Sequence, residues 1–262
     1  MPPKPDEQPI EEDQESLPLS QVSQLLTSFT QFLTICIHNI LYYRSIYPAE
    51  TFLTSRAYNL PVHQSRHPKV CSWIRDAVDA VKAQLILGAV ERVAVVIYDK
   101  QARVMERWMF DLASFPAWTG FKETGGMRTD EEEEEPAEEA GNIEPGAERK
   151  INGTDVDEQL RATVGKLAHA GEKMSSLPDG CTFTIAVELR DEAEAPIGHP
   201  QPWIPTLSNL QTISKENKTP GRDVGGAKMT PVRSVGAGPL FFECWVEEGK
   251  AKEQLSSNTS SE

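Results

Sequence analysis

The stretch SQVSQLLTSFTQFLTICIHNIL, residues 20–41, decides the fold. Its apolar residues recur at alternating gaps of three and one, the spacing that gathers them on one wide face of a long helix. They are Val22, Leu25, Leu26, Phe29, Phe32, Leu33, Cys36, Ile37, Ile40 and Leu41. So broad an apolar face is buried only if other elements surround the helix. We therefore expect a central helix that ends before Pro48.

Two further helices are expected downstream. The first is predicted to begin at Pro68, because proline suits the first helical position, and its inner side carries Val70, Ile74, Val78, Val81 and Leu85. The second is predicted to begin near Thr154, whose pairing with Asp157 resembles a capping box. Its inner side carries Val156, Leu160, Val164 and Leu167, while Gly165 and Gly171 weaken it.

The strands are expected in four places. VAVVIY (93–98) and RVMERWMFDL (103–112) flank the polar turn DKQA and predict a hairpin. CTFTIAVEL (181–189) alternates, which predicts a strand buried on one side or an inner strand beneath helices. LFFECWVEE (240–248) is predicted to be an edge strand with Phe242, Cys244 and Val246 inward, and Glu243 and Trp245 outward. Residues 51–65 are extended and short, and residues 191–239 are irregular.

This order of elements predicts an α+β domain over residues 19–246, with three helices packed on a mainly antiparallel sheet. The formal net charge of -14 lies largely elsewhere. Residues 130–148 hold ten acids and no base, and removing this run and the two acidic termini leaves about +3 on the rest. Dense like charge with few apolar groups does not offset the entropy cost of ordering. Residues 1–18, 119–152 and 247–262 are therefore predicted to be disordered.

Composition also indicates the cellular environment in which the protein is expected to work. The chain opens without a cationic and apolar leader, and no apolar run approaches the length of a membrane span, so we expect no membrane association. The four cysteines, Cys36, Cys71, Cys181 and Cys244, lie far apart and lack a C-x-x-C spacing. They are expected to be buried thiols in a reducing compartment. No strongly basic stripe indicates direct DNA binding.

The motifs that could carry catalysis are weak. His63 and His67 stand four apart, but Pro61 and Pro68 bracket them, and two such residues in an extended segment lie about 13 Å apart, too far for one ion. GRDVGGAKMT (221–230) resembles a phosphate loop but has Ala227 where the lysine should stand, which favours a flexible loop. We expect no catalytic residue, no metal site and no cofactor.

Aromatic residues in polar surroundings suggest protein binding instead. Tyr58 lies in the short extended segment, and Trp203 lies between prolines. Each could fill the core, because Trp is usually largely buried, or contact a partner peptide, where Trp and Tyr are favoured. Trp245 presents the same choice. The sequence pattern leaves both readings open.

Several motifs taken together resemble the HORMA domain family. They are NILYYRSIYPAETF (39–52), VAVVIYDK (93–100), VMERWMFDL (104–112) and GCTFTIAVELRDE (180–192). Within the family, YNLPV (58–62) followed by HP (67–68), GCTFT (180–184), PWI (202–204) and WVEE (245–248) are similar to the accessory, non-catalytic subunits of translesion DNA polymerase zeta. YPAETF and ERWMFD also resemble the spindle-checkpoint branch, which typically lacks PWI and the GCTFT strand start. The resemblance covers residues from about Val22 to Val246.

The resemblance implies a fold whose C-terminal segment is a mobile safety belt, here residues 191–246. The belt wraps around a partner peptide, which pairs as an additional strand. In the polymerase branch this peptide is a proline-containing segment of the zeta catalytic subunit. By resemblance it would contact Tyr58, Pro61, Trp203 and Ile204.

Two more surfaces follow from the resemblance. Met229, Glu243 and Trp245 match the surface that binds the C-terminal domain of the scaffold translesion polymerase, a deoxycytidyl transferase. Arg161 matches the helix face through which HORMA domains dimerise.

The function implied is that of an adaptor in translesion synthesis and DNA damage tolerance, in the nucleus and also the cytoplasm. Two alternatives stay open. One is a spindle-checkpoint HORMA protein that regulates mitotic progression, and the other is a metal hydrolase that uses His63 and His67.

Overall fold

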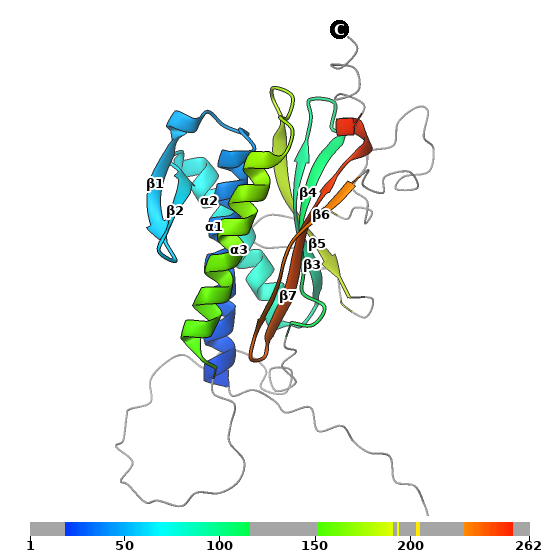
Figure 1. Cartoon of the computed structure of the whole chain (residues 1–262). Helices are drawn as coiled ribbons and strands as arrows, with labels where there is room; N and C mark the ends of the chain where they lie inside the picture. Colours follow the sequence, from blue (N-terminus) through cyan, green and yellow to red (C-terminus); the bar gives the residue numbers. More distant parts are fainter. Residues whose placement is uncertain (1–18, 116–150, 191–192, 194–202, 205–227, 254–262) are drawn as a thin grey trace, which may run out of the picture.

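The computed structural model describes residues 19–115, 151–190, 193, 203–204 and 228–253. In this part of the chain three helices lie on one side of a five-stranded antiparallel sheet, and a two-stranded hairpin lies beyond the helices (Figure 1). The elements are α1 (Leu19–Tyr43), a 3-10 turn η1 (Ala49–Thr51), β1 (Phe52–Ala57), β2 (Leu60–Ser65), α2 (Pro68–Ile86), β3 (Val90–Tyr98), β4 (Val104–Asp111), α3 (Gly153–Lys173), β5 (Thr182–Leu189), β6 (Lys228–Ala237) and β7 (Leu240–Glu248). The predicted α+β arrangement is confirmed.

Helix α1 is the centre of the core. Every residue of its predicted apolar face is buried, and its phenylalanines meet the sheet through ring contacts. Phe29 and Phe32 lie 5.4 and 5.5 Å from the ring of Phe242, between centroids. By length and composition α1 could cross a membrane, but 61% of its most apolar stretch is buried inside the protein, as in the core helix of a globular domain.

The two later helices begin close to where the sequence predicts. Helix α2 starts at Pro68 with His67 as its N-cap residue. Helix α3 is capped by Asn152, whose side chain accepts a hydrogen bond from the Thr154 amide, so the predicted capping box is replaced by a cap two residues earlier. Gly171 is required rather than merely tolerated. A Cβ at this position would lie 2.8 Å from the Cβ of Tyr43, so the glycine lets α3 approach α1 closely.

The sheet has the order β5-β3-β4-β7-β6. The predicted hairpin is formed by β3 and β4, but two other strand positions differ from expectation. Strand β7 is an interior strand between β4 and β6, whereas an edge strand was predicted. Strand β5 is an edge strand, paired only with β3 among the described strands, so of its apolar residues only Ile185 is fully buried. Alternation predicts the face of a residue but not the place of its strand in the sheet.

Strand β6 was missed by the sequence analysis, which expected residues 191–239 to be irregular. The strand contains Pro231 and Gly236 and lacks a clear alternation. Proline is tolerated because β6 lies at the sheet edge, and the register with β7 shifts beside it, between Pro231 and Arg233. Pairing with β7, which no local pattern reveals, makes this segment a strand.

The segment predicted to be short and extended forms the hairpin of β1 and β2, which packs against α1. Its two turn residues, Tyr58 and Asn59, have φ of 50° and 58°. Positive φ at both central residues is the geometry of the tight turns that match strand twist.

A buried carboxylate joins four parts of the chain. Glu106 of β4 is fully buried and receives both Nε and Nη2 of Arg44, at 2.9 and 2.8 Å. The same guanidinium donates to the carbonyls of Gly171 and Ser175 at the end of α3. Lys252 places its Nζ 2.5 Å from Glu106. The carboxylate therefore ties the end of α1, the end of α3 and the C-terminal residues to the sheet.

This network corrects the predicted C-terminal boundary. Residues 247–262 were expected to be disordered, but β7 continues to Glu248, and residues 249–253, which we call the C-terminal turn, pack against β4. The Gly249 amide donates to the Met105 carbonyl, and Lys252 is 4% exposed. The other predicted disordered segments, 1–18 and nearly all of 119–152, lie outside the described residues.

Replacing Glu106 by glutamine tests the network. The substitution keeps the side-chain shape but leaves Arg44 and Lys252 buried without their shared anion, so we expect the free energy of unfolding to fall by about 3–5 kcal/mol. Urea denaturation followed by circular dichroism measures the change. Glu158→Gln, on the exposed side of α3, is the matched control and should change stability by less than about 0.5 kcal/mol. Equal effects of the two variants would show that the network is not essential.

His38 makes stability depend on pH. Its ring is 4% exposed, its Nδ1 accepts a hydrogen bond from the Ser65 amide, and burial lowers its pKa from 6.5 to about 4. The unfolded state therefore binds more protons between these values, so the contribution of His38 is complete above pH 6.5 and is lost as the pH falls toward 4.

Between pH 7.5 and 4.5 we expect wild type to lose up to about 3 kcal/mol more stability than His38→Asn, whose amide oxygen can replace the acceptor without titrating. Denaturation at the two pH values measures the difference, and His67→Asn, at the exposed start of α2, should behave as wild type. A His38→Asn variant with the same pH dependence as wild type would contradict the assignment.

Candidate functional site

The unpaired side of β5 is the first candidate site. Cys181, Phe183, Ile185 and Val187 share the face that packs on the helices, as the alternation predicted. Phe183 and Val187 stay half-buried because no described strand covers the outer side of β5. An edge of this kind offers free backbone hydrogen-bonding groups beside an apolar surface. An extended peptide can add to it as a further strand.

Three aromatic residues gather at the beginning of this edge. The ring of Trp73, on α2, lies 5.2 Å from that of Phe183, and the ring of Tyr47 lies 6.5 Å from the same residue, between centroids. All three are half-buried. The alternation of residues 181–189 predicts only a buried face for Phe183, and no motif singled out Trp73 or Tyr47. Trp73 directly precedes Ile74, which belongs to the inner side of the helix. Its position beside that apolar side was the only feature of the sequence that could have indicated a role for Trp73.

Two residues of the predicted peptide contact lie in the connection between β5 and β6. Trp203 is half-buried and packs against the main core, and Ile204 is 82% exposed. A single exposed apolar side chain is common on protein surfaces, so the exposure of Ile204 alone does not mark a binding site. The remaining residues of this connection, apart from Arg190 and Ala193, lie outside the described residues.

The other two residues of that predicted set lie elsewhere. Tyr58 and Pro61 belong to the β1–β2 hairpin, which Figure 1 shows on the opposite side of the helices from β5. Tyr58 packs against the core, and burial, with Cys36 and Asp157 nearby, raises the pKa of its hydroxyl. Pro61 is exposed on β2. The structure therefore separates Tyr58 and Pro61 from the edge of β5.

The second candidate site is the sheet face turned away from the helices, which we call the open face. One row of residues crosses it strand by strand: Ala186, Ala94, Met109, Trp245 and Pro231. The first four of these, together with Val96, Val104 and Tyr98, form a second apolar cluster, built from strand residues alone. Trp245 stays half-buried, with its indole N–H donating to Glu247. An apolar band bordered by charged residues has the composition of a protein-binding surface.

Met229, Glu243 and Trp245, the residues predicted to form one surface, do lie together on the open face. Met229 is 64% exposed and pairs with Glu247, two positions along β7 from Trp245. Glu243 is exposed and accepts a hydrogen bond from the Ser234 hydroxyl. Trp245 faces outward as predicted, although its strand is interior. Arg161 is exposed on α3, as the predicted dimerisation face requires.

The histidine pair does not form a site. His63 stacks on Tyr42 with ring centroids 3.4 Å apart, and His67 caps α2. This agrees with the prediction of an extended segment followed by a helix start. Within the described residues no group of three or more His, Cys, Asp or Glu lies close enough to hold a metal ion.

The cysteines of the described chain are all free. Cys36 and Cys244 are buried as predicted, whereas Cys71 and Cys181 are half-buried because they lie at the start of α2 and beside the edge strand β5. Burial raises the pKa of Cys244 to about 12. Burial likewise raises the pKa of Cys36 and of Cys181, which is the opposite of the lowered pKa that a thiol nucleophile needs.

Comparisons with known proteins agree with this architecture. The HORMA domain model matches residues 26–226. The DNA polymerase zeta processivity subunit of Schizosaccharomyces pombe is 29% identical over 227 residues, which cover 87% of this chain and 94% of the relative. The mitotic spindle assembly checkpoint protein MAD2B of Danio rerio is 28% identical over 227 residues, covering 85% and 90%.

A solved structure with the same fold is C. elegans HTP-2 bound to HTP-3 closure motif 1. It aligns with a TM-score of 0.54 at 12% identity and covers 86% of each chain. The helices, the antiparallel sheet and a family model that spans most of the sequence lead to one conclusion. This chain belongs to the HORMA domain family.

Proposed function

We propose that this protein is a non-catalytic adaptor subunit of DNA polymerase zeta in translesion synthesis and DNA damage tolerance, in the nucleus and also the cytoplasm. In this role it entraps a proline-containing peptide of the catalytic subunit and bridges it to the scaffold translesion polymerase. The observation that carries the proposal is the free edge of β5, from which the chain departs toward the opposite edge of the sheet. Likeness to the yeast processivity subunit over nearly the full length supports the identity of the complex.

The ends of the connection between β5 and β6 support the belt. Leu189 and Lys228 lie on the two outermost strands of the sheet. Four strand spacings of about 4.8 Å separate these strands, roughly 19 Å in all. The connection holds about forty residues, and a chain of that length can extend beyond 100 Å. It is long enough to pass outside an added strand on β5 before it reaches β6, as a belt over residues 191–246 requires.

Anchoring at both ends would let the belt hold a peptide. Where the belt begins, Arg190 donates hydrogen bonds to the carbonyls of Val90 and Ala113. Where it ends, β6 and β7 pair with the sheet, and the C-terminal turn is fixed through Lys252 and Glu106. A peptide pairing with β5 would lie beside Phe183 and Trp73, with Trp203 anchored in the crossing segment. Release would require one anchored end to open, which slows dissociation.

The open face supports the bridging role. Met229, Glu243 and Trp245 lie on it around an apolar band, and a half-buried tryptophan beside an exposed methionine is typical of a binding hot spot. We assign this face to the C-terminal domain of the scaffold polymerase. Because β5 and the open face are separate surfaces, both partners could bind at once. Arg161, exposed on α3, is assigned to contact with a second HORMA domain.

A second candidate is a spindle-checkpoint HORMA protein that regulates mitotic progression. It is favoured by the zebrafish relative, whose name is that of a mitotic checkpoint protein. The fold and the peptide edge would serve either role, since they depend on backbone pairing rather than on the partner's identity. The partner sequence distinguishes the two.

Peptide capture tests the adaptor role. Proline-containing fragments of the zeta catalytic subunit and of checkpoint partners are titrated against the full chain by calorimetry. We expect tight binding of the zeta fragment, weakened about tenfold or more by Trp203→Ala and by Trp73→Ala, because each removes a large apolar contact. Phe241→Ala, a 42% exposed aromatic residue on β7, is the control and should bind as wild type.

Each other outcome of this titration has a definite meaning. Binding of checkpoint fragments alone would keep the fold and overturn the polymerase role. Loss of binding in Tyr58→Ala, with Trp73→Ala unaffected, would move the peptide to the β1–β2 hairpin. Binding of neither class would overturn the adaptor proposal.

The open face is tested separately. Trp245→Ala should weaken binding to the C-terminal domain of the scaffold polymerase about thirtyfold or more, since hot-spot residues contribute about 2 kcal/mol or more. Capture of the zeta peptide should be unchanged. Leu87→Ala, which truncates a 56% exposed residue just beyond α2, is the control. Retained binding by Trp245→Ala, measured by surface plasmon resonance, would rule out this face.

A further inference from the structure

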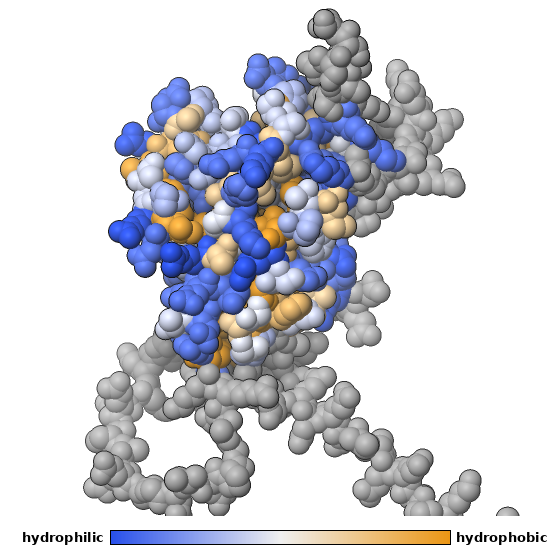
Figure 2. Space-filling model, viewed as in Figure 1, coloured by the Kyte–Doolittle hydropathy of each residue, from blue (hydrophilic) through white to orange (hydrophobic). Residues whose placement is uncertain are grey.

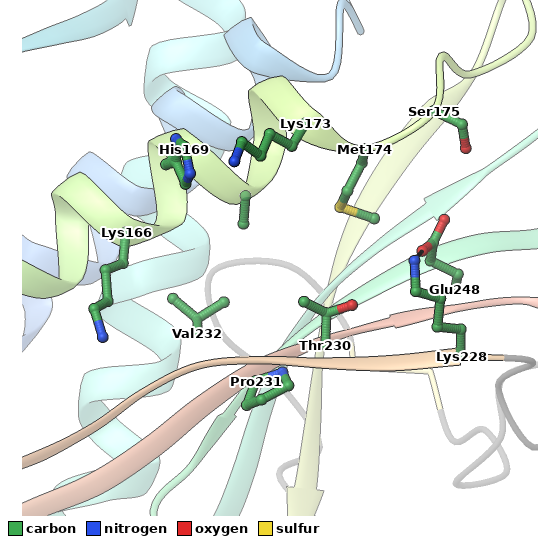
Figure 3. A pocket seen from close by; sticks show the side chains of 11 residues that line it. Lys166, His169, Lys173, Met174, Ser175, Lys228, Thr230, Pro231, Val232 and Glu248 are labelled. Atoms are coloured by element: carbon green, nitrogen blue, oxygen red, sulfur yellow. Dashed lines mark ion pairs between the residues drawn. The ribbon is translucent and has the colours of Figure 1, made fainter.

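A groove lies between α3 and β6, and Arg161, the α3 residue assigned above to contact with a second HORMA domain, does not line it. It is a cavity of about 460 Å³ between the second half of α3 and the start of β6, closed at one end by Glu248 of β7. Figure 3 shows Lys166 and Met174 extending from α3 toward β6, and Thr230 and Val232 extending from β6 toward α3. We call it the basic groove. It is separate from the β5 edge, and Pro231 is the one residue of the open-face row that also lines it.

The charge of the basic groove is opposite to that of the chain. Lys166, Lys173 and Lys228 line it, together with His169. Its lining contains one acid, Glu248, which is already paired with Lys228 at 3.3 Å and with Lys252 at 2.6 Å. Burial raises the pKa of Glu248, but its hydrogen bonds with these lysines outweigh burial and lower it, so the acid stays ionised and paired. The groove is thus locally cationic in a chain with a net charge of -14.

The end of α3 does not cancel this charge. The last carbonyls of a helix carry partial negative charge and repel anions. Here Arg44 donates hydrogen bonds to two of the carbonyls at this end, those of Gly171 and Ser175. Further along the groove, Arg233 of β6 donates a hydrogen bond to the side chain of Gln159 on α3. The charges of Lys166 and Arg233 both lower the pKa of the Cys244 thiol, although its burial has the larger effect and raises that pKa. Cationic groups therefore continue along the α3–β6 boundary.

The remaining lining residues restrict the kind of anion. Thr230 and Ser175 contribute hydroxyl donors, and Met174 and Val232 contribute apolar wall. A phosphate monoester carries a charge of about -1.5 to -2 and three acceptor oxygens, which suits several ammonium groups and hydroxyls better than a carboxylate does. Nucleic acid needs cations along a surface much longer than this groove, which Lys166, Lys173 and Lys228 line from one end to the other. Figure 2 shows that the front of the molecule over α3 is a hydrophilic band, accessible from outside.

We propose that the basic groove binds a phosphorylated serine or threonine side chain of a partner protein. Lys166 and Lys173 would contact the phosphate from α3, and Lys228 and Thr230 from β6. Met174 and Val232 would pack against the neighbouring residues of the partner segment. Partner docking at α3 would then depend on phosphorylation of the partner, independently of any peptide on β5.

The test uses the full chain with ¹³C-labelled methionine methyl groups. The probe is a mixture of nonapeptides with a fixed central phosphoserine and randomised flanks, and the same mixture with serine is the comparison. We expect the phosphorylated mixture to shift the Met174 methyl signal, assigned with Met174→Leu, and to leave that of the buried Met109 in place. Unphosphorylated mixture should bind at least about tenfold more weakly, because charge-assisted hydrogen bonds are lost.

Matched variants decide whether the groove is responsible. Lys166→Glu and Lys173→Glu should each weaken the response about tenfold or more, whereas Lys69→Glu, the same charge change at the exposed start of α2, should not. The proposal is overturned if the Met174 signal does not move at millimolar phosphopeptide, or if Lys69→Glu weakens binding equally. It is also overturned if inorganic phosphate matches the peptide response, or if a short DNA duplex shifts the signal at lower concentration.

Discussion

The burial of Glu106 is the constraint on which the rest of the structure depends. A carboxylate without solvent is tolerated only when cations and donors satisfy it, and here Arg44, Lys252 and the Trp108 indole do so. Each donor comes from a different part of the chain. The end of α1, the end of α3 and the C-terminal turn must all reach β4 at once. The hydrogen bonds and ion pairs of the buried Glu106 carboxylate therefore fix the positions of the end of α1, the end of α3 and the C-terminal turn.

The two edges of the sheet differ in what packs beside them. The C-terminal turn holds β7 against β4, and β6 follows on its far side, covered by α3. Strand β5, at the other end, has no described neighbour beyond β3. Strand β6 likewise pairs with only one described strand, β7, so the proposal of β5 for an incoming strand rests on the aromatic residues beside it.

The three surfaces proposed to bind partners differ in chemistry. The edge of β5 offers backbone hydrogen bonds next to aromatic rings, the open face offers an apolar band, and the basic groove offers cations. Backbone pairing accepts many sequences, so specificity must come from side-chain pockets and from the other surfaces. A protein can in this way select partners by combining several contacts, each of which discriminates only weakly between partners. Surfaces on separate faces allow those contacts to form together.

The sequence alone determined the helices, the β3–β4 hairpin and the inward residues of β5 and β7. The reason is that the spacing of apolar residues along the chain follows the period of the helix or strand that buries them. It also indicated the family, and with it the shared surface of Met229, Glu243 and Trp245. It did not reveal β6, the interior place of β7 or the C-terminal turn. Those depend on pairing and ion contacts between residues far apart in the chain, such as Glu106 with Lys252. Trp73 was overlooked for the same reason, because only the packing of α2 on the sheet brings it to Phe183.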